Sequence, residues 1–206
     1  MKYYFLKLLF ILVILMAPIS AIAKQKLMIV GDSLSAAYGL KQDDGWVKLL
    51  QNKYEAEQNP IEIINVSVSG QTTGNALAKI DQQLQTIAPS HVLIELGGND
   101  GLRGFPIKRL RANLTELVVS SQQFGAKVAV MEIQIPPNLG PRYTTMFTQS
   151  YQQVTEQTKS HLMPYFMLEI AGKPELMQDD NLHPNKAAQP IIRDFMYNAI
   201  NQWLAE

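Results

Sequence analysis

A serine that follows an apolar run is the first candidate for chemistry in this chain. The stretch "IVGDSLSAAYG", residues 29–39, places Asp32 and Ser33 where a strand is expected to end. A serine hydroxyl is a weak nucleophile unless a base accepts its proton and hydrogen-bond donors stabilise the resulting oxyanion. Ser33 is therefore a candidate nucleophile if other parts of the chain bring these groups to it.

A base is available in the stretch "QDDNLHPN", where His183 follows Asp180 by three residues. In a tight turn, this spacing lets a carboxylate reach the Nδ1–H of the ring and fix the tautomer that leaves Nε2 free as a base. An aspartate three residues before a histidine is a weak signal by itself. His183 becomes a strong candidate only in combination with the other groups.

Donors for an oxyanion are present in two further stretches. Gly70 lies in "NVSVSGQTT" and Asn99 lies in "LGGNDG". The backbone N–H groups of Ser33 and Gly70 and the side-chain amide of Asn99 could together form an oxyanion hole. Each residue also has a simpler explanation, because Gly70 could serve an unusual turn and Asn99 could cap the following segment.

The elements that must position these residues alternate along the chain. Short runs rich in β-branched residues predict strands at 26–30, 61–68, 91–97, 127–133 and, more weakly, 161–166. The clearest helical patterns between and after them span 106–124 and about 187–204. Alternating strands and helices predict a single α/β domain with a parallel sheet, which binds ligands at the carboxyl ends of its strands.

This rule separates the three histidines of the chain. His91 and His161 each begin a predicted strand and should lie at the amino edge in structural roles, whereas His183 follows the fifth strand. The stretches with Ser33, Gly70 and Asn99 follow the first three strands in order. All four stretches should therefore meet at the carboxyl edge of the sheet.

The four stretches together resemble the motifs of the SGNH (GDSL) hydrolase family. The matching segments are "GDSLSAAYG" with Ser33, "SVSGQTT" with Gly70, "GGNDG" with Asn99, and "DDNLHP" with Asp180 and His183. They span almost the whole chain after the first residues, and they are specific as a set although each is short. The resemblance is strongest to small secreted bacterial esterases and thioesterases of this family.

The resemblance implies a three-layer α/β/α sandwich with a five-stranded, flavodoxin-like parallel sheet. It further implies that Ser33 attacks an acyl carbonyl, that His183 acts as general base and then general acid, and that Asp180 orients His183. No cofactor or metal is implied. Asn181 stands where many relatives have glycine, and asparagine tolerates a left-handed backbone better than most residues. Asp179 is the alternative orienting residue, and the motif register favours Asp180.

Other classes of protein explain the same residues less completely. In a flavodoxin-like binding module, Ser33 and Ser35 would hold a phosphate on backbone amides, and the Asp180–His183 pair and Asn99 would have no role. A metallophosphoesterase would use Asp32, Asn99, Asp100 and His183 as ligands, but such sites usually need several histidines at this edge. An ordinary α/β-hydrolase is disfavoured because Ser33 is in no G-x-S-x-G motif.

Apolar residues in two loops are candidates for binding the acyl chain of a substrate. Leu102 and Phe105 lie in "DGLRGF", residues 100–105, in which Gly101 and Gly104 would let the loop shift. The second candidate is Leu139 in the loop 135–143 after the fourth strand. Lysophospholipids, acyl thioesters, aryl esters and acetylated sugars all react through the same type of tetrahedral intermediate. The candidate catalytic residues therefore do not indicate which of these is the substrate.

The first 23 residues have the pattern of a secretory signal peptide. A basic start is followed by an apolar stretch and by "AIA", residues 21–23, after which cleavage is expected. The alternative is an uncleaved membrane anchor, for which the apolar stretch is short. Cleavage would leave 16 basic and 18 acidic residues, a net charge of −2, and the chain has no cysteine.

These properties predict a periplasmic or secreted enzyme that is a monomer without disulfides. The charge shows no basic patch for nucleic acid, and no later apolar run is long enough to span a membrane. An exported enzyme would not meet cytosolic acyl-CoA. A lysophospholipid or another lipid-like ester is therefore the favoured small-molecule partner.

Overall fold

A five-stranded parallel sheet forms the centre of the protein in this computed structural model, which describes residues 25–206. The strand order is β2-β1-β3-β4-β5, and every neighbouring pair is parallel. The strands are β1 Gln25–Gly31, β2 Ile61–Asn65, β3 His91–Glu95, β4 Lys127–Met131 and β5 His161–Met163. The predicted signal peptide lies outside the described residues.

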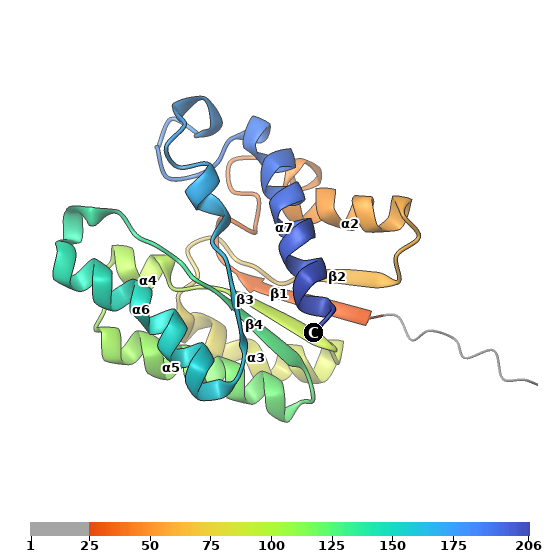
Figure 1. Cartoon of the computed structure of the whole chain (residues 1–206), viewed down its shortest axis with the longest axis horizontal. Helices are drawn as coiled ribbons and strands as arrows, with labels where there is room; N and C mark the ends of the chain where they lie inside the picture. Colours follow the sequence, from red (N-terminus) through yellow and green to blue (C-terminus); the bar gives the residue numbers. More distant parts are fainter. Residues whose placement is uncertain (1–24) are drawn as a thin grey trace, which may run out of the picture.

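Helices cover both faces of this sheet (Figure 1). Helices α3, α5 and α6 pack side by side on one face, and α2 and α7 pack together on the other. The helices are α2 Trp46–Ala56, α3 Thr73–Ile87, α4 Gly98–Leu102, α5 Ile107–Gln123, α6 Pro141–Thr158 and α7 Gln189–Leu204. The predicted α/β/α sandwich with a five-stranded parallel sheet is therefore confirmed.

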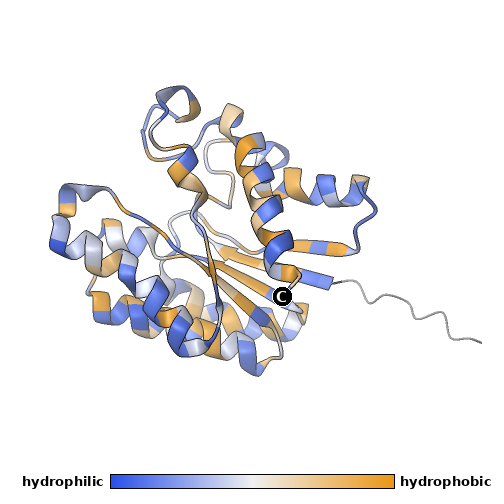
Figure 2. Ribbon diagram, viewed as in Figure 1, coloured by the Kyte–Doolittle hydropathy of each residue, from blue (hydrophilic) through white to orange (hydrophobic). Residues whose placement is uncertain are grey.

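Burial of apolar residues explains why these segments form strands and helices. All five residues of β3 are buried, as expected for a central strand with helices on both faces. Figure 2 shows the apolar residues concentrated in the sheet and the polar residues on the outer sides of the helices. In α5, Leu110, Leu114 and Leu117 form the buried stripe, and Gly125 ends the helix with a φ of +86°.

Most strands are shorter than their apolar runs predict. β2 ends at Asn65, although Val66 and Val68 still donate backbone hydrogen bonds to β1. The Asn65 side chain accepts from the N–H of Ser67 and donates to the carbonyl of Ser35, so it bends the chain at this point. The residues that follow leave the sheet and form the loop of Gly70.

Five short 3₁₀ helices complete the described structure. They are η1 Gln42–Asp44, η2 Pro137–Leu139, η3 Phe166–Glu169, η4 Pro174–Leu176 and η5 Lys186–Ala188. Two of them, η4 and η5, flank loop 177–185, which carries His183. Within residues 25–206, none of the helices has the length and apolar character needed to cross a membrane.

Candidate active site

The four sequence motifs meet in one cavity of about 250 Å³ at the carboxyl edge of the sheet. Ser33 lies in the turn after β1, Gly70 in the loop after β2, and Asn99 in helix α4 directly after β3. His183 reaches the same cavity from loop 177–185. The cavity is lined by Asp32, Ser33, Leu34, Tyr38, Ser69, Gly70, Glu95, Gly98, Asn99, Leu102, Ile133, Gln134, Pro136, Tyr165, Leu182 and His183.

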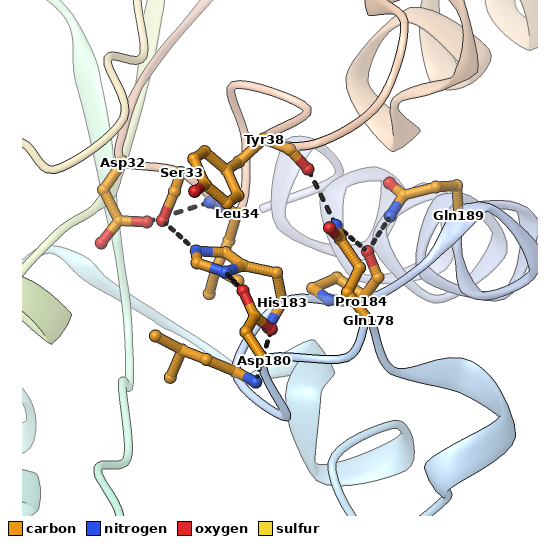
Figure 3. A network of polar contacts seen from close by, with 10 residues as sticks. Asp32, Ser33, Leu34, Tyr38, Gln178, Asp180, His183, Pro184 and Gln189 are labelled. Atoms are coloured by element: carbon orange, nitrogen blue, oxygen red, sulfur yellow. Dashed lines mark hydrogen bonds and ion pairs between the residues drawn. The ribbon is translucent and has the colours of Figure 1, made fainter.

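Ser33, His183 and Asp180 form a continuous chain of hydrogen bonds (Figure 3). The Oγ atom of Ser33 lies 2.9 Å from Nε2 of His183, and Nδ1 of the same ring lies 2.6 Å from Oδ2 of Asp180. With Nδ1 donating to the carboxylate, Nε2 is left as the acceptor for the serine proton. The arrangement is therefore competent for general-base activation of Ser33.

The loop around Asp180 stabilises its ionised form. Oδ1 accepts hydrogen bonds from the N–H groups of Leu182 at 2.9 Å and His183 at 3.0 Å. Partial burial raises the pKa of Asp180, but the hydrogen bonds from the backbone and ring of His183 and from Leu182 outweigh it and lower the pKa to about 2. Asn181 has a φ of +53°, which is the left-handed conformation expected for this position. It is Asp180, rather than Asp179, that contacts the ring.

The predicted oxyanion donors also lie around the cavity. Gly70 has a φ of +77°, and a side chain would be strained there although the space beside it is open. Nδ2 of Asn99 donates one hydrogen to Oδ2 of Asp32 at 3.1 Å. Since an amide nitrogen carries two hydrogens, the second remains free for a ligand in the cavity.

Asp32, considered from sequence only as a metal ligand, orients Asn99 and caps the turn of Ser33. Its Oδ1 accepts from the N–H of Leu34 at 3.1 Å, while its Oδ2 accepts from Asn99. Burial raises the pKa of Asp32 to about 6, and the hydrogen bonds from Leu34 and Asn99 limit this rise. Its position between Gly31 and Ser33 in the first motif was the available signal for a role at this site.

Glu95 lies under the same turn and is fully buried at the end of β3. Its Oε2 accepts from the hydroxyl of Ser35 at 2.8 Å and from the N–H of Asp32 at 3.3 Å. Oε1 is buried without a hydrogen-bond partner among the described residues. Burial, with a smaller effect from Asp32, raises the pKa of Glu95 well above its usual value. Sequence reasoning missed it, because a glutamate ending an apolar run gives no sign of burial.

Tyr38 is a second residue that sequence reasoning missed. Its ring lies against the imidazole of His183, with a centroid separation of 4.4 Å and an angle of 37° between the planes (Figure 3). Its N–H donates to the carbonyl of Ser33 at 3.2 Å. Tyr38 therefore contacts the backbone of Ser33 and the ring of His183.

Of the three residues predicted to contact an acyl chain, Leu102 alone lines the cavity. Phe105 packs against Arg109, whose guanidinium carbon lies 5.1 Å from the ring centroid, and its carbonyl accepts from the hydroxyl of Tyr143. Leu139 lies in η2 and lines a separate hollow that includes Tyr143. The loop 135–143 reaches the main cavity through Pro136 instead.

The predicted hinge at Gly101 is a packing site. Gly101 lies inside α4, where a Cβ atom would come within 2.7 Å of Phe147 and 2.8 Å of Ile135. Glycine is thus needed there for close approach rather than for movement. Gly104 has a φ of +64° and open space around it, which is compatible with the predicted role as a flexible turn residue.

Asp100, the remaining candidate metal ligand, has structural partners, and so do the two histidines at the amino edge. Asp100 is buried and accepts from the N–H of Thr73 at 2.9 Å and from its hydroxyl at 2.6 Å, which places it at the start of α3. His91 and His161 both contact the ring of Trp203 at the amino edge of the sheet, His91 edge-on and His161 stacked. Among residues 25–206, no group of three or more acidic or histidine side chains is arranged to hold a metal ion.

Comparison with known proteins identifies relatives across most of the chain. Residues 29–190 match the GDSL-like Lipase/Acylhydrolase family. An arylesterase of Vibrio mimicus is 44% identical over 174 residues, which cover 84% of this chain and 87% of the relative. The thioesterase 1/protease 1/lysophospholipase L1 of Escherichia coli K12 is 39% identical over 176 residues, covering 85% of this chain and 83% of that protein.

Solved structures agree with this relationship. The psychrotrophic esterase EstA from Pseudoalteromonas sp., in a crystal structure inhibited by monoethylphosphonate, is 60% identical with a TM-score of 0.88. The match covers 88% of this chain and 100% of the EstA chain. The chain belongs to the GDSL-like lipase/acylhydrolase family of ester hydrolases, as its four motifs predicted.

Proposed function

We propose that the protein is a serine esterase that hydrolyses acyl esters through a covalent acyl-enzyme on Ser33. The observation that carries this proposal is the unbroken chain from Ser33 Oγ to His183 Nε2, at 2.9 Å, and from Nδ1 to Asp180, at 2.6 Å. The roles are nucleophile for Ser33, general base and acid for His183, and orienting carboxylate for Asp180.

The reaction has two halves. In the first, Oγ of Ser33 bonds to the acyl carbon while Nε2 of His183 accepts its proton, and the alcohol then leaves with that proton. In the second, water attacks the acyl carbon, His183 accepts a proton from the water, and Ser33 regains a proton from His183 as the acid departs. Both halves pass through a tetrahedral oxyanion.

The oxyanion is stabilised by three donors in this proposal. They are the N–H groups of Ser33 and Gly70 and the second hydrogen of the Asn99 amide. The hydrogen bond from Asn99 to Asp32 supports this role, because it holds the amide in place before a substrate arrives. Donors arranged in advance require no reorganisation during the reaction.

The favoured substrates are lysophospholipids or other lipid-like esters, and acyl thioesters and aryl esters are chemically possible. Leu34, Leu102, Ile133 and Pro136 give the cavity an apolar wall that suits an acyl chain. The relatives named as arylesterase and lysophospholipase support the same class of chemistry. A carbohydrate O-acetyl esterase is the alternative, since an acetyl group needs no such wall.

The central test is the substitution Ser33→Ala, which removes only the attacking oxygen. Turnover of a 4-nitrophenyl ester should fall by about 10⁴-fold or more, while the thermal unfolding temperature stays close to that of the wild type. A serine-directed phosphonate should label the wild type at Ser33 and leave the variant unlabelled. Labelling of another residue, or an active variant, contradicts the proposal.

A further inference from the structure

The proposed nucleophile and base lie on two loops that are 150 positions apart in the sequence. Ser33 belongs to the turn after β1, whereas His183 belongs to loop 177–185 between η4 and η5. The Nε2–Oγ separation therefore depends on how these two loops are held against each other. Catalysis is sensitive to this separation, because a misplacement of about 1 Å costs on the order of 10²-fold in rate.

Loop 177–185 is closed by its own hydrogen bonds. The N–H of Gln178 donates to the carbonyl of His183 at 2.8 Å, and the N–H of Asn185 donates to the carbonyl of Leu176 at 2.8 Å. Asp180 adds its bonds to the N–H groups of Leu182 and His183. These bonds shape the loop and hold the Asp180–His183 pair, but they do not join the loop to Ser33.

Two side-chain amides converge on the carbonyl of Pro184, the residue after His183 (Figure 3). Nε2 of Gln178 donates to this carbonyl at 3.1 Å and to the carbonyl of Tyr38 at 2.8 Å. Nε2 of Gln189 donates to the same carbonyl at 3.4 Å and to the carbonyl of Asn185 at 3.2 Å. The backbone next to His183 is thus held by two different side chains.

Gln178 connects directly to the nucleophile loop. Its partner Tyr38 donates a backbone hydrogen bond to the carbonyl of Ser33 and places its ring on His183. The chain has glycine at position 39, where φ is +74° and a Cβ atom would overlap the Gln178 amide. Because glycine has no Cβ atom, the side-chain amide of Gln178 can occupy the space beside Gly39.

Gln189 makes the second connection through Trp46. Its Oε1 accepts from the N–H of Trp46 at 3.0 Å, and the indole nitrogen of Trp46 donates to the carbonyl of Leu34 at 3.1 Å. Gln189 and Trp46 are both buried. An ion pair between Lys186 and Asp44 joins the same regions, but Lys186 is exposed and such pairs contribute little in salt.

We propose that Gln178 and Gln189 are positioning residues for His183. Their amide groups connect the carbonyl of Pro184 to the segments that follow Ser33, and they thereby set the separation of Nε2 from Oγ. This inference rests on the proposed function. It predicts that loss of one amide weakens the chemical step while loop 177–185 and the Asp180–His183 pair remain intact.

The variant Gln178→Met tests this inference, because Gln178 is half-buried and methionine keeps its length without the donor. We expect kcat for a short 4-nitrophenyl ester to fall about 10- to 10²-fold, with KM changed less than about twofold. The matched control is Gln122→Met. Gln122 is also half-buried and donates to the carbonyl of Thr158 at 2.9 Å, far from the site, so its loss should leave kcat unchanged.

Proton NMR separates positioning from folding of the loop. The Nδ1 proton of His183, held by Asp180, should keep its downfield resonance in Gln178→Met even though kcat falls. Unchanged kcat in Gln178→Met contradicts the inference, and so does loss of this resonance together with kcat, because the loop itself would then have unfolded. A wild type without esterase activity refutes the proposed function and the positioning role with it, whereas an active wild type with an equally active variant refutes the positioning role alone.

Discussion

Three carboxyl groups within this site differ because their surroundings differ. Hydrogen bonds to Asp180 outweigh its partial burial and lower its pKa to about 2, whereas burial raises the pKa of Asp32 to about 6. Burial also raises the pKa of Glu95 well above its usual value. Asp180 is thus the group that carries a full negative charge next to the imidazole, which is what an orienting carboxylate requires.

The two adjacent aspartates allow a direct test of the orienting residue. Asp180→Asn should lower kcat/KM by about 10²- to 10⁴-fold, because an amide cannot stabilise the imidazolium and favours the wrong tautomer. Asp179→Asn is the matched control and should retain nearly full activity. Stronger loss in Asp179→Asn than in Asp180→Asn would reverse the assignment.

Glu95 makes a prediction about stability rather than turnover. Its pKa in the folded protein lies above the ordinary value of 4.5, so above that pH the folded state holds a proton that the unfolded chain has released. This contribution to stability is present at low pH and is lost as pH rises. Glutamine cannot ionise, and its amide can donate from the position of Oε1.

We therefore expect the free energy of unfolding of Glu95→Gln to increase relative to that of the wild type as pH rises from about 4.5 to 8. The difference in free energy of unfolding between variant and wild type should grow over this range, because folding raises the pKa of the wild-type carboxyl and glutamine has no such group. Urea unfolding at several pH values measures this, with the exposed Glu116→Gln as control. A difference that does not change with pH would show that Glu95 is ionised in the folded protein.

The motif residues could be chosen from the sequence because their order follows the strands. Ser33, Gly70 and Asn99 each follow a predicted strand, and parallel strands bring such residues to one edge. The residues that support them could not be chosen in this way. Glu95, Tyr38 and Gln178 act through contacts between distant segments, and nothing in their local sequence indicates those contacts.

At the level of elements, the sequence predicted the strands and the two clearest helices but extended the ends of most strands. The run 127–133 is mostly apolar, yet β4 ends at Met131, and Ile133 lies in the cavity wall. The run 161–166 similarly exceeds β5, and Phe166 begins η3. An apolar pattern reports burial, and buried residues of an active-site loop give the same pattern as a strand.

Helix α4 and the loop that follows it make a prediction about acyl chains. Leu102 lines the cavity and is 42% exposed, so an acyl chain can cover it, whereas Leu139 lines a different hollow. Leu102→Ala should lower kcat/KM for long-chain esters about 10-fold and change that for acetyl esters little, since each buried methylene contributes about 0.8 kcal/mol. Rates on 4-nitrophenyl acetate, octanoate and palmitate measure the dependence.

Leu139→Ala is the matched control for this prediction. It removes the same number of carbon atoms from an apolar residue on the neighbouring loop, outside the cavity. Its rates should match those of the wild type at all chain lengths. Equal losses in Leu102→Ala on short and long esters would mean that Leu102 shapes the site rather than binding the chain. A loss confined to long esters in Leu139→Ala would extend the acyl path to the second hollow.

At the scale of the whole molecule, the fold begins close to the expected cleavage site. β1 starts at Gln25 and pairs with Ile61, so cleavage after Ala23 would leave one residue before the sheet. None of the residues in the sheet, the helices or the cavity would be removed. The mature enzyme should therefore keep the fold and activity of the full chain, with its net charge changed from zero to −2.

Expression of the full chain in a bacterial host tests the proposal that residues 1–23 are a cleaved signal peptide. Signal peptidase needs a small residue before the cleaved bond, so the wild type should be recovered from the periplasm or medium with Lys24 as its first residue. Ala23→Arg should block processing and leave the full-length chain bound to the membrane fraction, as shown by mass spectrometry and fractionation. The chain expressed without residues 1–23 is the control, and its kcat and thermal unfolding temperature should equal those of the processed enzyme. An exported wild type that retains residues 1–23 would instead identify them as an anchor, and the esterase would then act at the membrane surface.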